Sequence, residues 1–367
     1  MAGSIQRFTF AAVALPILFV AMTGMARAAT IIVNTLDGGS QYGLCTLEDA
    51  VVAAETQAAV HACAAGSGHH DTIQFSVSGT IFIANTLSMK TPGENLTIVG
   101  PVFNGITING QTYRQLMDVE TTGLSLENLT LTEGSAESGG AMYINLALVS
   151  ITGCTFTSNG AFDGGAIFAG GVSGVSVLNS TFTSNLASDG GGAIYNVLSG
   201  LSVTNVTFSG NQSGSTPPGD GAPFPPSGTG ACVNNHLGLI AVKSSIFARS
   251  VRGGNCVGIT DHLGYNLSDD NSCGFSGTSE NSVSNLNLDG LALNGGPTET
   301  VAPGYGSRAI DFVPIAKCTI VANVPLKNDQ RGLAAPTPPT STSATPARMS
   351  PARCPPSRSC RAASACR

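Results

Sequence analysis

A motif that returns at a fixed interval constrains this chain more than any other feature. Phe-x-x-Asn begins at Phe156, Phe182 and Phe208, so successive copies start 26 residues apart. A constant period of this length predicts that the chain stacks copies of one small unit and does not form a compact globule. Each unit is too small to bury its own apolar face, so its neighbours must cover that face.

The residues around the motif predict the shape of one unit. Gly-Gly-Ala-Ile follows the first two motifs at 164–167 and 191–194, and Gly139-Gly-Ala-Met142 after Leu131 marks an earlier unit with Leu in place of Phe. Stretches that alternate apolar and polar residues read as short strands with one buried face. A unit of about 20–26 residues with three such strands predicts an all-β, right-handed parallel β-helix. A β-propeller is the main rival, but its blades need about 40–50 residues.

The Phe, Asn and Gly residues of a unit have separate physical roles. We expect each Phe to point inward and stack on its copies, which stabilises by about 1.5–3 kcal/mol per buried ring. The Gly pair allows a sharp bend. Asn tolerates the left-handed conformation at a corner, and stacked Asn side chains would form an amide ladder. The Asn residues concerned are Asn159, Asn185 and Asn211.

Composition agrees with a turn-rich β chain and limits its partners. The 367 residues include 46 Gly and 19 Pro, and only 10% are charged, which favours a turn-rich β fold over a helical one. The net charge of −6 argues against nucleic acid and anionic membranes as partners.

Residues 1–28 are typical of a secretory signal sequence. Arg7 supplies the positive charge, Phe8–Val20 is the apolar core, and Ala26-Arg27-Ala28 is a small-residue cleavage site. A transmembrane anchor is the alternative, but the apolar run is short and contains Pro16. No later segment is apolar enough to cross a bilayer. We therefore expect a mature chain that starts near Ala29 and is extracellular, on the cell surface or periplasmic.

The remaining chain divides into four predicted regions. Residues 29–70 form an N-terminal cap, in which Cys45–Glu55 is an amphipathic helix with Thr46 and Asp49 in a capping arrangement. This helix would cover the exposed edges of the first coil. Residues 71–254 form the coils, interrupted by a Pro-rich loop at 212–227. Residues 255–332 form a loop-rich closing region, and residues 333–367 a disordered tail or the product of a shifted reading frame.

Ten cysteines fit an oxidising compartment. We expect one disulfide between Cys45 and Cys63 and another between Cys256 and Cys273. Cys154 lies inside a repeat and is predicted to be a small core residue. The sequence has no Cys-x-x-Cys pair and no His at zinc spacing with Cys, so it predicts no structural metal site.

These motifs carry a resemblance to known families. Phe-x-x-Asn followed by Gly-Gly-Ala-Ile resembles the polymorphic outer-membrane protein repeat, and Cys45-Thr-Leu-Glu-Asp-Ala-Val51 is similar to the Cys-Ser-Leu-Arg-Glu-Ala-Ile (CSLREA) motif of secreted bacterial β-helix proteins. Segments in the C-terminal part resemble the end of choice-of-anchor Q proteins, namely 255–256, 264–267, 273–274, 294–298, 309–311 and 329–332. The resemblance implies a β-helix and export, and an adhesin-like role only by analogy. Glu48-Asp49 departs from the usual Arg-Glu.

Two groups of polar residues are candidates for an active site. Asp163 and Asp189 precede the glycine turns of neighbouring units, about 5 Å apart between backbones. Such a pair would suit a glycoside hydrolase or a weak site for Ca²⁺ as a cofactor. Asp before Gly-Gly is also an ordinary turn residue, and we favour the turn. The second group lies in the predicted C-terminal loops and consists of Arg249, Arg252, Asp261 and His262.

The sequence predicts a secreted or cell-surface β-helix protein without catalytic activity, which interacts with a surface glycan or protein. No Lys or Arg occurs between Arg114 and Lys243, so the regular coils offer no basic catalyst for a polysaccharide lyase. The absence of Trp also argues against a sugar-stacking platform. The alternative is a carbohydrate-active enzyme, a lyase or glycoside hydrolase, on the same scaffold. A third hypothesis is a passenger exported through the outer membrane with a partner's help.

Overall fold

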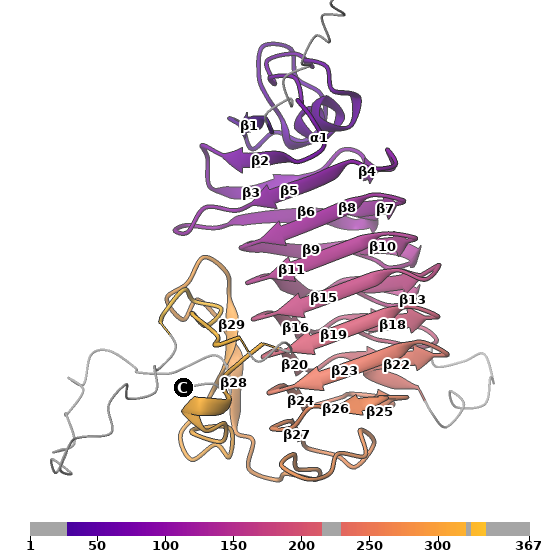
Figure 1. The fold of residues 1–367 in the computed structure, drawn as a ribbon, viewed down its shortest axis with the longest axis vertical. Coiled ribbons are helices and arrows are strands. Elements are labelled where there is room, and N and C mark those ends of the chain that lie inside the picture. The colour runs from indigo at the N-terminus through magenta and orange to yellow at the C-terminus, as the bar shows by residue number, and fades with distance from the viewer. Residues whose placement is uncertain (1–27, 215–228, 321–323, 335–367) are drawn as a thin grey trace, which may run out of the picture.

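The computed structural model describes residues 28–214, 229–320 and 324–334. Within these ranges the chain winds through three parallel sheets that run along one elongated body, with a helix at its N-terminal end (Figure 1). One coil passes from the first sheet through the third to the second. All but the last residue of the predicted signal sequence, most of the predicted 212–227 loop and almost all of the predicted tail lie outside the described residues.

The first sheet forms one face along the whole body, and the second forms another. The first sheet consists of β1 (Thr30–Val33), β2 (Asp71–Phe75), β5 (Asn95–Val99), β8 (Gly123–Glu127), β11 (Leu148–Thr152), β15 (Gly174–Leu178), β19 (Gly200–Thr204), β23 (Leu239–Lys243) and β26 (Asp261–His262). The second consists of β4 (Leu87–Met89), β7 (Met117–Glu120), β10 (Met142–Asn145), β14 (Ile167–Gly170), β18 (Ile194–Val197), β22 (Gly230–His236) and β25 (Gly254–Val257).

The third sheet has two arms, because the long strand β9 pairs with both β12 and β13. Its strands are β3 (Gly79–Phe82), β6 (Ile106–Arg114), β9 (Leu129–Ser138), β12 (Thr155–Thr157), β13 (Gly160–Asp163), β16 (Thr181–Thr183), β17 (Leu186–Ala187), β20 (Thr207–Ser209), β21 (Gln212–Ser213), β24 (Ile246–Ala248) and β27 (Leu267–Ser268). Strand β21 occupies the first two residues of the predicted 212–227 loop. These parallel sheets confirm the predicted β-helix.

The phenylalanines of the repeat form one inward column. Phe156, Phe182 and Phe208 pair in register and are fully buried, with ring centroids 4.6 and 5.1 Å apart. Phe247 extends the column at 4.9 Å, and Phe275 covers its end at 5.6 Å from Phe247. The predicted column is therefore confirmed. It runs inside the continuous apolar core of the coils.

The asparagines of the repeat form the predicted ladder. Asn159 donates from Nδ2 to Oδ1 of Asn185 at 2.9 Å, and Asn185 donates to Oδ1 of Asn211 at 3.0 Å. The prediction that Asn itself takes the left-handed conformation is wrong. The residue before it does so, with φ of 56° at Ser158 and 57° at Ser184. The corner falls there because the Asn side chain must face the interior to reach its neighbours.

Glycine is required at the bend before each Ala-Ile or Ala-Met pair. Gly139, Gly164 and Gly191 have φ between 65° and 66°. A Cβ atom on any of them would lie within about 2.5 Å of a backbone carbonyl oxygen in its own turn. Any other residue would therefore combine a strained backbone with a steric clash.

The predicted N-terminal helix is α1 (Leu47–Thr56), and it lies beside β1, β2 and β4 at the start of the first coil. The hydroxyl of Thr46 accepts the Asp49 backbone N–H at 3.1 Å, which is the predicted N-cap. The buried apolar residues of α1 join the core of the coils, and they include Leu47, Ala50, Val51 and Ala54.

The coils continue further than the sequence predicts. Strands β25, β26 and β27 pair in parallel with β22, β23 and β24, so the last coil ends at Ser268 and not at residue 254. The motif is hard to recognise there because Ser268 takes the register position of Phe247 and no ring marks the coil. Residues 269–284 then cover this end, with Phe275 on the phenylalanine column.

Residues 285–320 and 324–334, which we call the C-terminal strap, do not close the end as predicted but return along the side of the coils (Figure 1). The strap contains the antiparallel pair β28 (Leu288–Ala292) and β29 (Thr300–Pro303) and the short 3₁₀ helix η1 (Ile315–Lys317). Thr298 donates to the carbonyl of Gly153 at 3.0 Å, and Gln330 donates to Thr298 at 3.1 Å and to the carbonyl of Cys154 at 3.2 Å. Thr181 donates to Gln330 and Lys243 donates to the carbonyl of Ile320, so the strap spans several coils.

The predictions for five cysteines are confirmed. Disulfides join Cys45 to Cys63 and Cys256 to Cys273. Cys154 is fully buried in the core, and burial raises the pKa of its thiol to about 12. The thiol is therefore protonated at neutral pH and unreactive.

We expect Phe182→Ala to lower the free energy of unfolding by about 3–5 kcal/mol, because it opens a cavity in the middle of the column. The matched control is Phe162→Ala, since Phe162 is 55% exposed and its loss should change stability by less than about 0.5 kcal/mol. Urea unfolding of both variants measures the difference. Equal effects would contradict the role assigned to the column.

Candidate functional site

The structure brings the two aspartates of the repeat together at the junction of the third and second sheets. Asp163 ends β13, and Asp189 lies one coil further on, where its backbone N–H donates to the Phe162 carbonyl at 2.9 Å. Asp163 and Asp189 are both only half-buried. The pair is therefore accessible from one corner of the body.

The two carboxyl groups have different environments. Burial, followed by the negative charge of Asp189, raises the pKa of Asp163, while the backbone N–H of Gly190 opposes the change. Oδ1 of Asp163 is buried and accepts no hydrogen bond. Both observations favour the protonated acid at Asp163, which is a property that general acids in glycosidases also need.

An aromatic ladder lies beside this pair on the outer face of the second sheet. Tyr143, Phe168 and Tyr195 pair in register, with ring centroids 5.4 and 5.9 Å apart and nearly parallel planes. The sequence analysis missed the ladder, although each ring follows Gly-Gly-Ala-Met or Gly-Gly-Ala-Ile directly. The rings cover one another, so the ladder offers a sugar few free ring faces.

A metal site at the aspartate pair stays a prediction. Among the described residues, no group of three or more His, Cys, Asp and Glu side chains is arranged to hold a metal ion. Two carboxylates alone supply fewer oxygens than the six to eight or so that Ca²⁺ prefers.

The second predicted group does not converge on one site. The guanidinium of Arg249 donates to backbone carbonyls of β28 and so holds the strap. Arg252 is exposed. Asp261 faces solvent on the first sheet, whereas the ring of His262 packs edge-on against Phe275 with centroids 5.3 Å apart. Adjacent residues of a strand point to opposite faces, which separates the last two.

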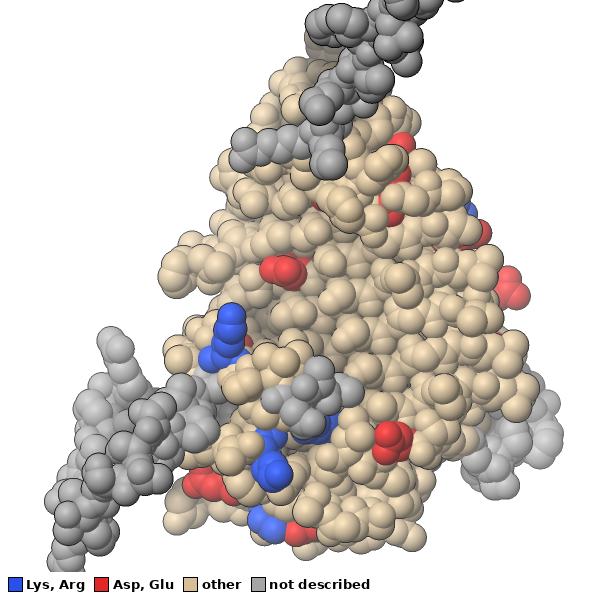
Figure 2. Space-filling model, in the orientation of Figure 1, with Lys and Arg blue, Asp and Glu red and all other residues tan. Residues whose placement is uncertain are grey.

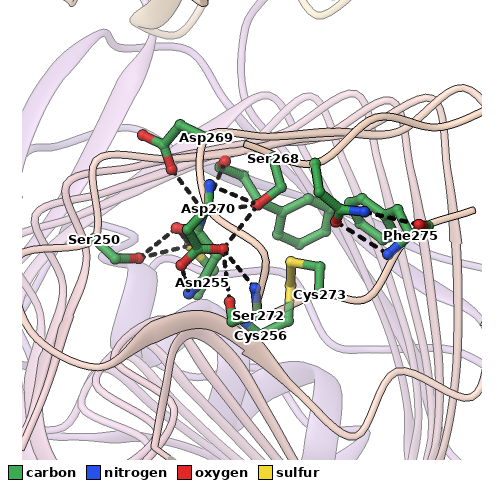
Figure 3. The surroundings of a disulfide bond; sticks show 12 residues. Ser250, Asn255, Cys256, Ser268, Asp269, Asp270, Ser272, Cys273 and Phe275 are labelled. Carbon is green, nitrogen blue, oxygen red and sulfur yellow. Dashed lines mark hydrogen bonds between the residues drawn. A yellow bond between two sulfur atoms is a disulfide. The ribbon is translucent and has the colours of Figure 1, made fainter. Parts of the chain in front are cut away.

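The polar residues near the Cys256–Cys273 disulfide form a structural network (Figure 3). Asn255 donates from Nδ2 to Asp269 at 2.8 Å and to Ser268 at 2.9 Å. Asp270 accepts the hydroxyl of Ser272 at 2.7 Å and the backbone N–H of Asn255 at 2.8 Å. Burial opposes the change, but these hydrogen bonds lower the pKa of Asp270. These side chains hold the closing loop in place, and they form their hydrogen bonds with other groups of the chain.

A groove of about 930 Å³ runs along the outer face of the first sheet. A column of hydroxyl groups forms its floor, one per coil and in register. This hydroxyl column consists of Thr97, Ser125, Ser150, Ser176 and Ser202. Parallel pairing places successive hydroxyl-bearing residues about 4.8 Å apart.

A second column contains both glycines and protruding side chains, which makes the surface of the groove uneven. Leu148 and Leu239 are 73% and 72% exposed, and Gly174 and Gly200 lie between them in register. The missing side chains leave a depression between two apolar projections. The sequence analysis missed this site, although Gly-x-Ser or Leu-x-Ser recurs with the same period as the Phe motif.

The groove is almost free of charge. The ionisable residues of its lining are His70 and Asp261, which belong to the first and last of the coils it crosses. Figure 2 shows this face, with few charged side chains over its middle. The hydroxyls can donate and accept hydrogen bonds, but no acid and base flank them to activate a nucleophile. The geometry therefore suits binding better than catalysis.

Comparison with known proteins agrees with the architecture. Residues 179–197, which include β16, β17 and β18, match the family model of the Chlamydia polymorphic membrane protein repeat. No curated protein matches the chain significantly. The chain is thus a parallel β-helix with polymorphic membrane protein-like repeats. In the described part of the chain, no helix is long and apolar enough to span a membrane.

We expect the stability of the wild-type chain to rise relative to Asp163→Asn as the pH falls from 7. The pKa of Asp163 is raised in the folded state, so its stabilising contribution is complete below the unfolded pKa of about 3.9 and is lost as the pH rises through the folded pKa. Urea unfolding of both chains at several pH values measures the difference. In the Asp189→Asn background the dependence should shrink, and a difference that does not vary with pH would refute the assignment.

Proposed function

We propose that this protein is a surface-associated, non-catalytic β-helix that binds a neutral, extended ligand, such as a glycan strand, in the groove of the first sheet. The observation that carries the proposal is the hydroxyl column, which repeats at the spacing of the coils beside the apolar projections of Leu148 and Leu239. A ligand with hydroxyl groups and apolar ring faces matches both parts of this lining. A polyanion finds no cation among the lining residues.

Placement outside the cytoplasm has separate support. The repeat match is to a family of membrane proteins by its description. Two disulfides join the described residues, and such bonds persist in oxidising compartments. The predicted signal sequence points the same way. We infer export and attachment at the cell surface, where the long outer face would be available for adhesion.

Filling the groove should weaken ligand binding without unfolding the chain. A Cβ atom at Gly200 would have its nearest neighbour at 4.0 Å, and so would one at Gly160, which lies on β13 outside the groove. We expect Gly200→Leu to weaken binding to the best ligand from a neutral glycan panel by about tenfold or more, and Gly160→Leu to leave it unchanged.

Salt gives a second check on the same binding. Because the lining is neutral, affinity should change little between about 0.05 and 0.5 M NaCl, a range that weakens contacts between exposed charges strongly. Binding that is lost equally in both leucine variants, or that collapses with salt, would refute the groove as the site.

A second candidate function is glycoside hydrolysis at the aspartate pair, and the raised pKa of Asp163 is the observation that favours it. Asp163 would act as the general acid and Asp189 as the nucleophile or base. We expect no turnover of a polysaccharide panel, measured by reducing ends. Turnover that falls at least about 100-fold in both Asp163→Asn and Asp189→Asn would establish the enzyme instead. Gly200→Leu distinguishes the two sites, because it should weaken binding in the groove but leave any turnover at the aspartate pair unchanged.

A further inference from the structure

The first residue after the predicted signal sequence, Ala29, is held by a buried carboxylate in the folded chain. The backbone nitrogen of Ala29 lies 2.8 Å from Oδ1 of Asp71. Asp71 begins β2 and is only 2% exposed. The Ala29 carbonyl accepts the N–H of Thr72 at 2.9 Å, so the start of β1 is held on both sides of the residue.

The other partners of the Asp71 carboxylate are neutral. Ser67 donates its backbone N–H at 3.0 Å to Oδ1 and at 3.2 Å to Oδ2. Gln57, the C-cap residue of α1, donates from Nε2 to Oδ2 at 2.9 Å. No ion pair of the described residues includes Asp71. A buried carboxylate without a counter-charge is costly.

We propose that the chain is cleaved between Ala28 and Ala29 and that Asp71 then binds the new α-ammonium group of Ala29. Ala28 is exposed in the structure and is the last residue of the small-residue cleavage pattern. Water adds across the peptide bond, so Ala28 leaves with a carboxylate and Ala29 keeps a protonated amine. A signal peptidase of the exporting cell catalyses this step.

Cleavage changes the chemistry of the contact without moving the atom. Before cleavage, the Ala29 nitrogen donates one neutral hydrogen bond. After cleavage, the same nitrogen carries up to three N–H donors and a positive charge beside a buried carboxylate. The mature chain therefore fastens β1, the C-terminal end of α1 and the Ser67 loop to one ion pair. Removal of the leader completes the N-terminal cap.

The test uses the full chain, exported by its own leader from a bacterial host. Mass spectrometry of the purified protein should place its N-terminus at Ala29. Ala29→Gln cyclises after cleavage, with loss of ammonia, to a lactam that has no ammonium group, whereas Ala29→Ser keeps one. We expect the unfolding equilibrium constant in urea to be about tenfold larger for the lactam form than for the Ser form.

The Asp71→Asn background decides whether the carboxylate is responsible, because there the lactam and Ser forms should unfold alike. Glu48→Gln is the matched control: Glu48 is another buried carboxylate held by backbone N–H groups, and its change should destabilise both forms equally. If Asp71→Asn does not fold, a chain whose cleavage site is shifted to retain Ala28 replaces it and should unfold like the lactam form. An N-terminus elsewhere, or lactam and Ser forms of equal stability, would overturn the proposal.

Discussion

In-register stacking of identical side chains is the interaction on which this structure depends. Each coil buries its inward face only because the next coil presents the same residues at the same height. The phenylalanine column supplies the apolar part, and the Asn159–Asn185–Asn211 ladder satisfies polar groups that would otherwise be buried without partners. The bends at Gly139, Gly164 and Gly191 have the same backbone conformation, so successive coils follow the same path and both columns stay aligned.

The same regularity shapes the outer faces. A residue that faces outward in one coil has a counterpart in the next, so any property of the outer surface is repeated along the axis. The repeats of this chain place hydroxyls on the first sheet, rings on the second and one pair of carboxyls at a corner. Charge is almost absent from the first of these faces. The groove therefore presents the same hydrogen-bonding groups at regular intervals along the axis.

The periodic parts of the fold could be predicted from sequence because spacing alone fixes their register. The inward Phe156–Phe182–Phe208 column and both disulfides follow from positions in the chain. The path of the strap could not be predicted, because Thr298 meets Gly153 through a contact that no local pattern encodes. Nor could the sequence show that Asp261 and His262 diverge, since that depends on which coil face each occupies. The sequence contains the period of the hydroxyl column. It could not show that the column lies in a groove, because the groove depends on where the neighbouring glycines lie in three dimensions.

The strap changes how such a stack comes apart. In an open solenoid, end coils fray one at a time because each contacts only its neighbours. Here Gln330 bonds to the carbonyl of Cys154 and to Thr181, and Lys243 bonds to Ile320, so coils in the middle of the body are tied to the segment that leaves the last one. Peeling the C-terminal coil requires these ties to break as well. The strap thus couples the last coil to the middle of the body, so loss of that coil becomes more cooperative than in an open solenoid.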